Sequence, residues 1–172
     1  MMALITKGDD TAGAIFSECE RYRYRLWRVW DASKPRLCFV MLNPSTATHE
    51  VLDPTVSRCK TRAETLGYGG LEVVNIFALR STDPKGLYGI DDPVGPHNFA
   101  AIVDAIKKCS IAICAWGTHG KFLSMGQTIK FRMQGFYPEK THYLKLNTDG
   151  SPAHPLYLSY ELKPVLWEGD SI

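Results

Sequence analysis

The sequence lacks the features that mark several large classes of protein. No apolar run in its 172 residues approaches the roughly 20 residues that span a bilayer. The segment Met1–Lys7 lacks the basic and then apolar build of a signal peptide. The five cysteines contain no Cys-x-x-Cys pair, so zinc-ribbon and thioredoxin-like interpretations have no basis. We therefore expect a cytoplasmic protein without a membrane partner, whose cysteines are buried thiols.

Several catalytic fingerprints are also missing. The chain contains no Walker loop, no G-x-G-x-x-G and no G-x-S-x-G, so P-loop hydrolases, dinucleotide-binding dehydrogenases and α/β-hydrolases lack their signatures. His49, Asp53, His119 and His154 show no H-x-H or H-E-x-x-H ligand spacing. We assign no metal ligand and no cofactor, and a metal-assisted hydrolase built from these four side chains is kept as a minor alternative.

No strong excess of one charge is present, because the formal net charge is +2. This excludes a protein whose whole surface binds a polyanion. The balance is uneven, since residues 21–36 contain six Lys or Arg against one Asp. Arginine alternates there with Tyr22, Tyr24 and Leu26 before the phase slips at Trp27, which predicts an edge strand or hairpin over about residues 20–31, with a bulge. Its arginines would form either a solvated edge or a strip that faces phosphate groups.

What is present predicts one α/β domain over residues 1–172. Apolar runs at residues 37–42, 71–77 and 111–116 read as buried strands, with a weaker one at 142–146. Helical stripes separate them: residues 55–66 after the Asp53-Pro54 cap, 99–106 after the cap Asn98, and 121–134. This alternation predicts a three-layer α/β/α sandwich with a mostly parallel central sheet.

Ligands bind such sheets at the carboxyl ends of the strands, where this sequence places polar residues. Most have a structural alternative: Asn43 can close an Asx turn, Asn75 can cap a loop, Arg80 can clamp Asp83, and His154 can be structural. Asp53 can be a general base, but capping explains it better. The candidate ligand-binding residues are Asn43, Pro44, Ser45, Asn75, Arg80, Thr82, Trp116, Gly117, His119, His154, Pro155 and Leu156.

Two resemblances emerge when these residues are read in order. The close one is to an uncharacterised bacterial and phage family, a domain of unknown function, and it implies no activity. The resemblance covers most of the chain, roughly from Arg36 to Trp167, and it rests on five short pieces. These pieces are Met41–Ser45, Leu52–Thr55, Val74–Arg80, Trp116-Gly117 and His154–Tyr157.

The remote resemblance is to the uracil-DNA glycosylase superfamily, especially its mismatch-specific thymine/uracil branch. Asn43-Pro44, Asn75 to Thr82, Trp116-Gly117 and His154-Pro155 are similar to its motifs in order and spacing. The resemblance implies a uracil-DNA glycosylase-like fold in which Asn43 holds or activates the attacking water and Asn75 reads the base edge. His154 would stabilise negative charge on the departing base.

The same resemblance implies that the loops carrying Ser45 and Leu156 touch the DNA backbone or wedge its gap. The chain departs from the branch at Met41 and Ser45, which replace glycines, and at Leu156, which replaces a serine. The resulting hypothesis is a glycosylase-like enzyme that cleaves an N-glycosidic bond in a modified nucleic acid or nucleotide, with Asn43 and His154 as catalytic residues. The alternative is a non-catalytic nucleotide- or DNA-binding module on the same fold.

Overall fold

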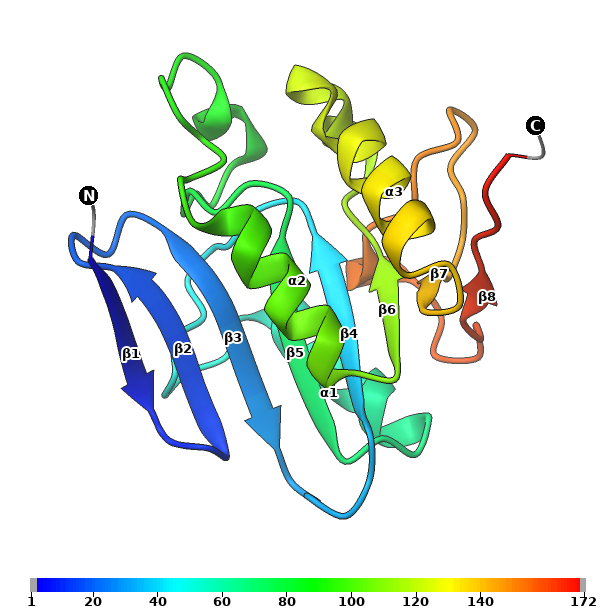
Figure 1. Cartoon of the computed structure of the whole chain (residues 1–172). Coiled ribbons are helices and arrows are strands. Elements are labelled where there is room, and N and C mark those ends of the chain that lie inside the picture. The colour runs from blue at the N-terminus through cyan, green and yellow to red at the C-terminus, as the bar shows by residue number, and fades with distance from the viewer. Residues whose placement is uncertain (1–2, 171–172) are drawn as a thin grey trace.

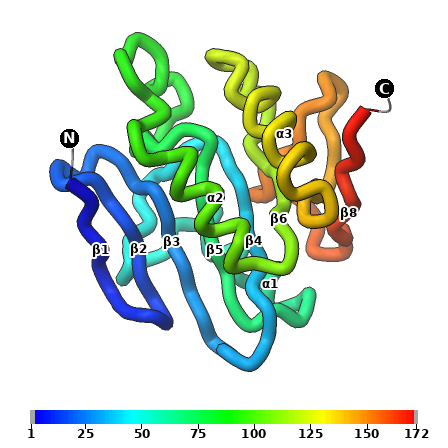
Figure 2. Tube along the Cα trace, in the orientation of Figure 1, coloured from blue at the N-terminus to red at the C-terminus, as the bar shows by residue number. Residues whose placement is uncertain are grey.

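The computed structural model describes residues 3–170, and within them eight strands form one sheet in the order β1-β2-β3-β5-β4-β6-β7-β8. The first and last of these strands lie at its two edges (Figure 2). The strands are β1 (Leu4–Gly8), β2 (Ala12–Ser17), β3 (Arg23–Val29), β4 (Arg36–Met41), β5 (Gly70–Asn75), β6 (Ile111–Cys114), β7 (Thr141–Tyr143) and β8 (Val165–Leu166).

The sheet is mixed, so the prediction of a mostly parallel sheet is wrong. The pairings β4–β5, β4–β6 and β6–β7 are parallel, as the strand–helix alternation predicted. The other four pairings, β1–β2, β2–β3, β3–β5 and β7–β8, are antiparallel. The error arose toward the ends of the chain, where β1, β2 and β8 are short and carry no long apolar run.

The segment predicted as an edge strand or hairpin is β3, which is not an edge. It lies between β2 and β5, and β1 and β2 form the outer hairpin. Arg23, Arg25 and Arg28 are therefore only 2%, 9% and 9% exposed, so neither a solvated edge nor a phosphate-facing strip is present. The pairing of β2 with β3 contains a register shift at Ile15/Phe16, which is a bulge in β2.

The predicted helices are present with two corrections. The helix α1 (Pro54–Thr65) begins as expected, with Asp53 Oδ1 accepting from the Val56 N–H at 2.9 Å. The helix α2 (Asn98–Lys108) is not capped by Asn98, because His97 is its N-cap and makes no side-chain cap hydrogen bond. The helix α3 (Met125–Phe136) begins later than predicted because a 3₁₀ segment, Thr118–Ser124, precedes it.

The helices cover both faces of the sheet (Figure 1). Val56, Cys59 and Ala63 of α1 belong to one buried cluster, which also contains Phe39 of β4 and Val73 of β5. Helices α2 and α3 pack into the second cluster on the other face. The fold is thus a mixed α/β architecture in which helices cover the parallel strands β5-β4-β6-β7 and α2 also packs against β3.

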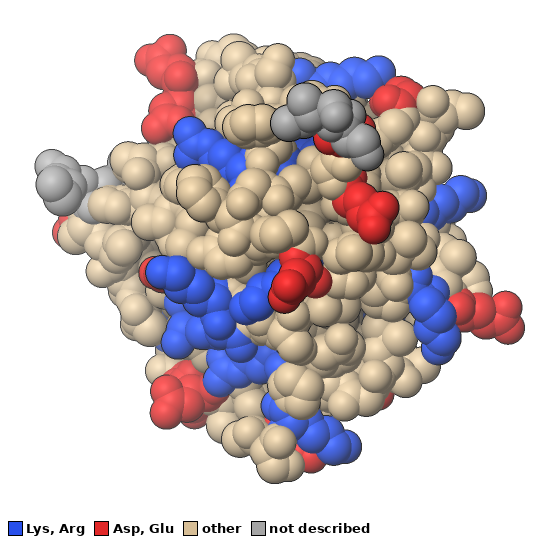
Figure 3. Space-filling model, turned by 45° about the vertical axis from the view of Figure 1, so that its right-hand side comes forward, with Lys and Arg blue, Asp and Glu red and all other residues tan. Residues whose placement is uncertain are grey.

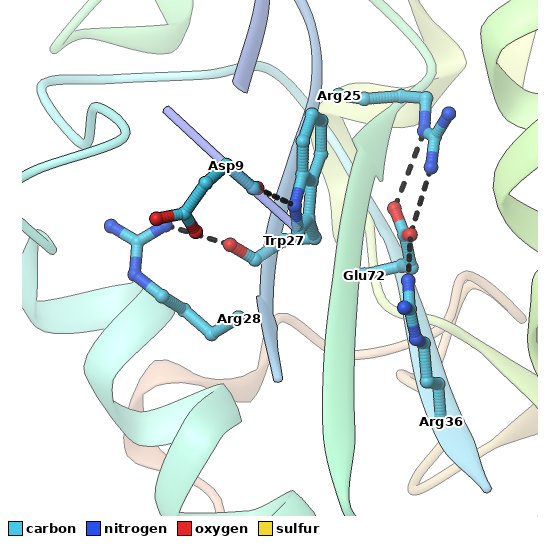
Figure 4. A network of polar contacts seen from close by, with 6 residues as sticks. All are labelled: Asp9, Arg25, Trp27, Arg28, Arg36 and Glu72. Carbon is cyan, nitrogen blue, oxygen red and sulfur yellow. Dashed lines mark hydrogen bonds and ion pairs between the residues drawn. The ribbon is translucent and has the colours of Figure 1, made fainter. Parts of the chain in front are cut away.

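A buried ion-pair network joins three neighbouring strands (Figure 4). Glu72 of β5 is fully buried, and its Oε1 accepts from Arg25 Nη2 at 2.8 Å and from Arg36 Nη1 at 3.1 Å. The Arg25 guanidinium also lies 5.3 Å from the centre of the Trp27 ring. Burial raises the pKa of Glu72, and the two guanidinium groups oppose that rise. This network fixes the register of β3, β4 and β5.

Four of the five cysteines are buried thiols as predicted, and Cys19 is exposed. Within residues 3–170, no helix has both the length and the apolar character needed to cross a membrane. On the face shown in Figure 3, basic and acidic side chains are interspersed, with one larger group of Lys and Arg.

Candidate functional site

A cleft of about 390 Å³ lies at the carboxyl ends of the parallel strands. Strand β4 pairs with β5 on one side and with β6 on the other, so the strand order reverses at β4. Ligands of open α/β sheets bind at such reversals. Ten of the predicted residues line the cleft: Asn43, Pro44, Ser45, Asn75, Thr82, Trp116, Gly117, His119, His154 and Leu156.

Arg80 and Pro155 do not line the cleft. Arg80 donates from Nε to the Ser45 carbonyl at 3.4 Å and from Nη1 to the Glu20 carbonyl at 3.2 Å, and its guanidinium lies over the Phe16 ring. Pro155 is buried at the start of a 3₁₀ turn. Both residues therefore support loops of the cleft from outside.

Asn43 is half-buried directly after β4, and its amide faces two carbonyl groups. Its Nδ2 donates to the Ser81 carbonyl at 2.8 Å and to the Pro44 carbonyl at 3.1 Å. These bonds tie the loop after β4 to the loop after β5. They occupy the amide donors, so Oδ1 is the atom of this side chain that can accept from a water or a ligand.

Asn75 ends β5 on the floor of the cleft, beside Arg23 of β3. Both residues are 2% exposed, and Arg23 Nη2 approaches Asn75 Oδ1 at 3.4 Å. Arg23 Nη1 donates to the Ala47 carbonyl at 3.1 Å. Burial lowers the pKa of Arg23 to about 10, and the Asp53 carboxylate opposes this shift. The guanidinium remains charged at neutral pH.

The backbone around Asn75 is held by α2. Asn98 Nδ2 donates to the carbonyl groups of Asn75 and Ile76, at 2.8 Å and 3.2 Å. This is why Asn98 is buried at the start of the helix without capping it. It keeps the carboxyl end of β5 against α2 and so fixes where the Asn75 side chain begins.

Asp53 both caps α1 and lines the cleft. Its Oδ1 accepts from the Val56 N–H, and its Oδ2 accepts from the Ala47 N–H at 3.3 Å. The side chain is 8% exposed, and its charge acts on Arg23 and on His154. The capping interpretation is therefore right, but it is incomplete, because the same carboxylate contributes to the electrostatics of the cleft.

His154 lies at the opposite rim, in the turn that follows Ala153. Its Nδ1 accepts from the Leu156 N–H at 3.3 Å, which places the proton of the neutral ring on Nε2. The residue is exposed over part of its surface, yet desolvation of the ring lowers its pKa, against the opposing charge of Asp53. A neutral imidazole with an Nε2–H donor can stabilise negative charge on a ligand oxygen.

Trp116 forms an apolar wall of the cleft and is 3% exposed. Its ring is seated against two glycines: a Cβ at Gly120 would lie 2.2 Å from Trp116 Cδ1, and one at Gly126 would lie 2.7 Å from Nε1. Any larger residue at either position would displace the indole. The ring also packs against Trp167, with centroids 5.9 Å apart.

Guanidinium groups hold the two loops that flank the cleft. In the loop after β4, the carbonyl groups of Ser45, Ala47 and Thr48 accept from Arg80, Arg23 and Arg28 respectively. In the segment after His154, the Leu158 carbonyl accepts from Arg58 and Arg62 of α1, and the Ser159 carbonyl accepts from Arg62. Tyr160 lies beneath both of these guanidinium groups.

The four side chains considered for a metal-assisted hydrolase do not form a ligand set. Across residues 3–170, no group of three or more His, Cys, Asp or Glu side chains is placed to hold a metal ion. His119 Nδ1 lies 3.2 Å from the Tyr88 hydroxyl, and His49 Nε2 lies 3.5 Å from a Glu50 carboxylate oxygen.

The sequence did not indicate Arg23 as a cleft residue, and it favoured capping over a general-base role for Asp53. The cleft is also lined by Met41, Leu42, Thr55, Val56, Ser81, Pro84 and Thr118. A usable signal existed for Asp53, because the residue that caps the first helix after a buried strand stands near the carboxyl edge of the sheet. None existed for Arg23, because β3 contains three arginines and no local pattern distinguishes the one that lines the cleft.

Comparison with known proteins gives a family but no activity. A family model described as "Protein of unknown function (DUF1643)" matches residues 23–156, a span that contains every predicted site residue. No curated protein and no solved structure matches the chain.

Proposed function

Because the chain belongs to this family of unknown function, we propose from the cleft itself that the protein is a glycosylase-like enzyme that cleaves an N-glycosidic bond in a nucleotide or nucleic acid. The observation that carries the proposal is the convergence of Asn43, Asn75 and His154 on one cleft. They come from three separate segments, and nothing in the packing of the sheet requires all three to face one space.

The residue types suit this reaction. The bond between the anomeric carbon and the base nitrogen breaks, and its electron pair leaves with the base. A water oxygen bonds to the anomeric carbon, and the proton that this water loses is taken up by the departing base. Such a step needs a placed water and stabilisation of the departing charge more than a strong nucleophile. Asn43 Oδ1 would orient the water, and His154 Nε2–H would donate to an oxygen of the base.

The fold agrees with the proposal in its parallel part. Strands β5-β4-β6-β7 with helices on both faces provide the kind of sheet expected from the resemblance to uracil-DNA glycosylases. The antiparallel hairpin β1–β2 with β3, and the edge strand β8, are additions that the resemblance did not imply. Met41 stands where the mismatch-specific branch has a glycine, and its side chain would narrow the space near the base or phosphate.

The test is release of free base from a panel of modified nucleosides, nucleotides and oligonucleotides. Removing a donor that stabilises the transition state costs on the order of 10²–10³ in rate, so we expect a loss of this size for His154→Ala. Asn43→Ala removes the acceptor that positions the water, and we expect a loss of about 10² in rate. Asn147→Ala and His142→Ala are matched controls, because these residues do not line the cleft. The proposal fails if no substrate in the panel releases base.

One observation favours the non-catalytic alternative. The Asn43 donors are bound to carbonyl groups and both Asp53 oxygens accept from backbone N–H groups, so the cleft holds no carboxylate free of backbone contacts among the described residues. A binding module would show tight, salt-dependent association with nucleic acid and no turnover. Binding measured beside the release assay separates the two.

A further inference from the structure

Two donors on the floor of the cleft have no acceptor within the described residues 3–170. They are Arg23 Nε and Asn75 Nδ2, and both atoms are buried. A buried N–H without a partner costs about 1–3 kcal/mol, and more for a charged group. Because each residue also lines the cleft, a ligand in the cleft can supply the missing acceptor.

The pairing of the two side chains fixes which atoms are left over. Arg23 has only donors, so the Asn75 oxygen turns toward it, with Nη2 and Oδ1 3.4 Å apart. The Asn75 Nδ2 is thereby directed away from the guanidinium. The floor presents one charged donor and one neutral donor, and it offers no acceptor from either residue.

From these contacts we infer that Arg23 and Asn75 form a subsite for a monoanionic oxygen on a planar heterocycle. The inference deepens the proposed function and rests on it for the heterocycle, because the oxygen that the subsite takes is one on which charge gathers when a base departs. Arg23 would be the cationic partner of that oxygen, and His154 would donate to the ring from the rim.

The charge of the cleft favours a monoanion over a phosphate dianion. Asp53 lines the same cleft, and its charge acts on both Arg23 and His154. A dianion would meet this fixed carboxylate with a single guanidinium to offset it, whereas a ring oxygen with one negative charge is matched by Arg23 alone. Met41, Val56 and Trp116 provide apolar walls that suit a flat ring.

The probe is barbiturate, a planar oxo-heterocycle that is anionic at neutral pH, and its binding to the full chain is measured by calorimetry. Uracil is the neutral ring, benzoate is the carboxylate monoanion, and inorganic phosphate is the competing anion. We expect barbiturate to bind more tightly than uracil and phosphate. Equal or tighter binding of benzoate would overturn the assignment of the oxygen to a heterocycle.

The variants separate a role in binding from a role in folding. Arg23→Gln removes the charge and is expected to weaken barbiturate binding about 10-fold to 100-fold. Arg28→Gln is its control, since Arg28 donates to the neighbouring Thr48 carbonyl of the same loop but does not line the cleft. Asn75→Asp places a carboxylate against Arg23, so we expect a folded protein that has lost the site.

The inference is overturned if wild-type protein does not bind barbiturate, if phosphate binds as tightly, or if Arg23→Gln and Asn75→Asp bind barbiturate within threefold of the wild-type affinity. Failure of the proposed function is a separate result. Barbiturate binding that depends on Arg23, without base release from any substrate, would leave the subsite standing and end the glycosylase proposal. Base release that is unaffected by Arg23→Gln and Asn75→Asp would support the glycosylase proposal and overturn the subsite.

Discussion

Arg23 and Arg25 stand two residues apart on β3, and their surroundings differ. The Arg25 guanidinium binds Glu72 at 2.8 Å, and Arg36 completes the network from β4. Arg23 has the Ala47 carbonyl and the Asn75 amide oxygen as its hydrogen-bond acceptors, and within residues 3–170 no carboxylate is bonded to it. Burial of a charge is costly unless the charge is paired. Arg25 therefore belongs to the framework of the sheet, whereas Arg23 has unused capacity to bind a ligand.

The largest effect is expected from Glu72→Gln. The substitution leaves the buried Arg25 and the partly exposed Arg36 without a carboxylate, which should lower the free energy of unfolding by about 3–5 kcal/mol. Urea denaturation measures it. Glu64→Gln is the control, because Glu64 pairs with Lys60 at i, i+4 on an exposed helix surface and should cost about 0.5 kcal/mol or less. Similar losses for the two variants would contradict the assignment of Glu72 to the framework.

A smaller effect on the free energy of unfolding is expected at Asp53, the cleft carboxylate whose charge acts on Arg23. Asp53→Ala removes the cap of α1 and should cost about 1 kcal/mol, whereas Asp53→Ser keeps a capping oxygen and should cost less. Because the charge of Asp53 raises the pKa of His154, both variants should lower that pKa further in an NMR titration. An unchanged titration would show that the two residues do not interact in the cleft.

The smallest effect concerns pH. The pKa of His154 in the folded chain lies below its ordinary value of 6.5, so between the two values the unfolded chain binds more protons. Stability should therefore fall as the pH drops through this window. His154→Gln should remove that part of the decrease, as measured by urea midpoints at pH 7 and pH 5. Parallel curves for wild type and variant would contradict the lowered pKa.

The sequence predicted the elements whose signals are local. Asp53-Pro54 and the stripe Val56, Cys59 and Ala63 specify α1, and the apolar runs specify β4, β5 and β6. The strand ends then indicated where polar side chains would meet, and ten of the twelve predicted residues line one cleft. These predictions share a cause, because each cap, stripe and strand end is specified by residues close to it in the sequence.

The failures depended on partners far away in the sequence. Whether Arg23 is solvated or buried is decided by β5, about fifty residues later, and by the hairpin β1–β2 that covers the other side of β3. Asn98 looked like a cap because its type and position fit one, but its amide is used by the carbonyl groups that end β5. No short-range pattern distinguishes these cases.

The arginine contacts to the segment after His154 have a consequence for how the protein is made. Arg58 and Leu158 are 100 residues apart in sequence, and Arg62 and Ser159 are 97 residues apart. Closing loops of this length has an entropic cost before the contacts repay it, and it slows folding. During synthesis, strands β1 to β6 and helix α1 emerge from the ribosome before the segment that carries His154, so the cleft is completed only after that segment has been translated.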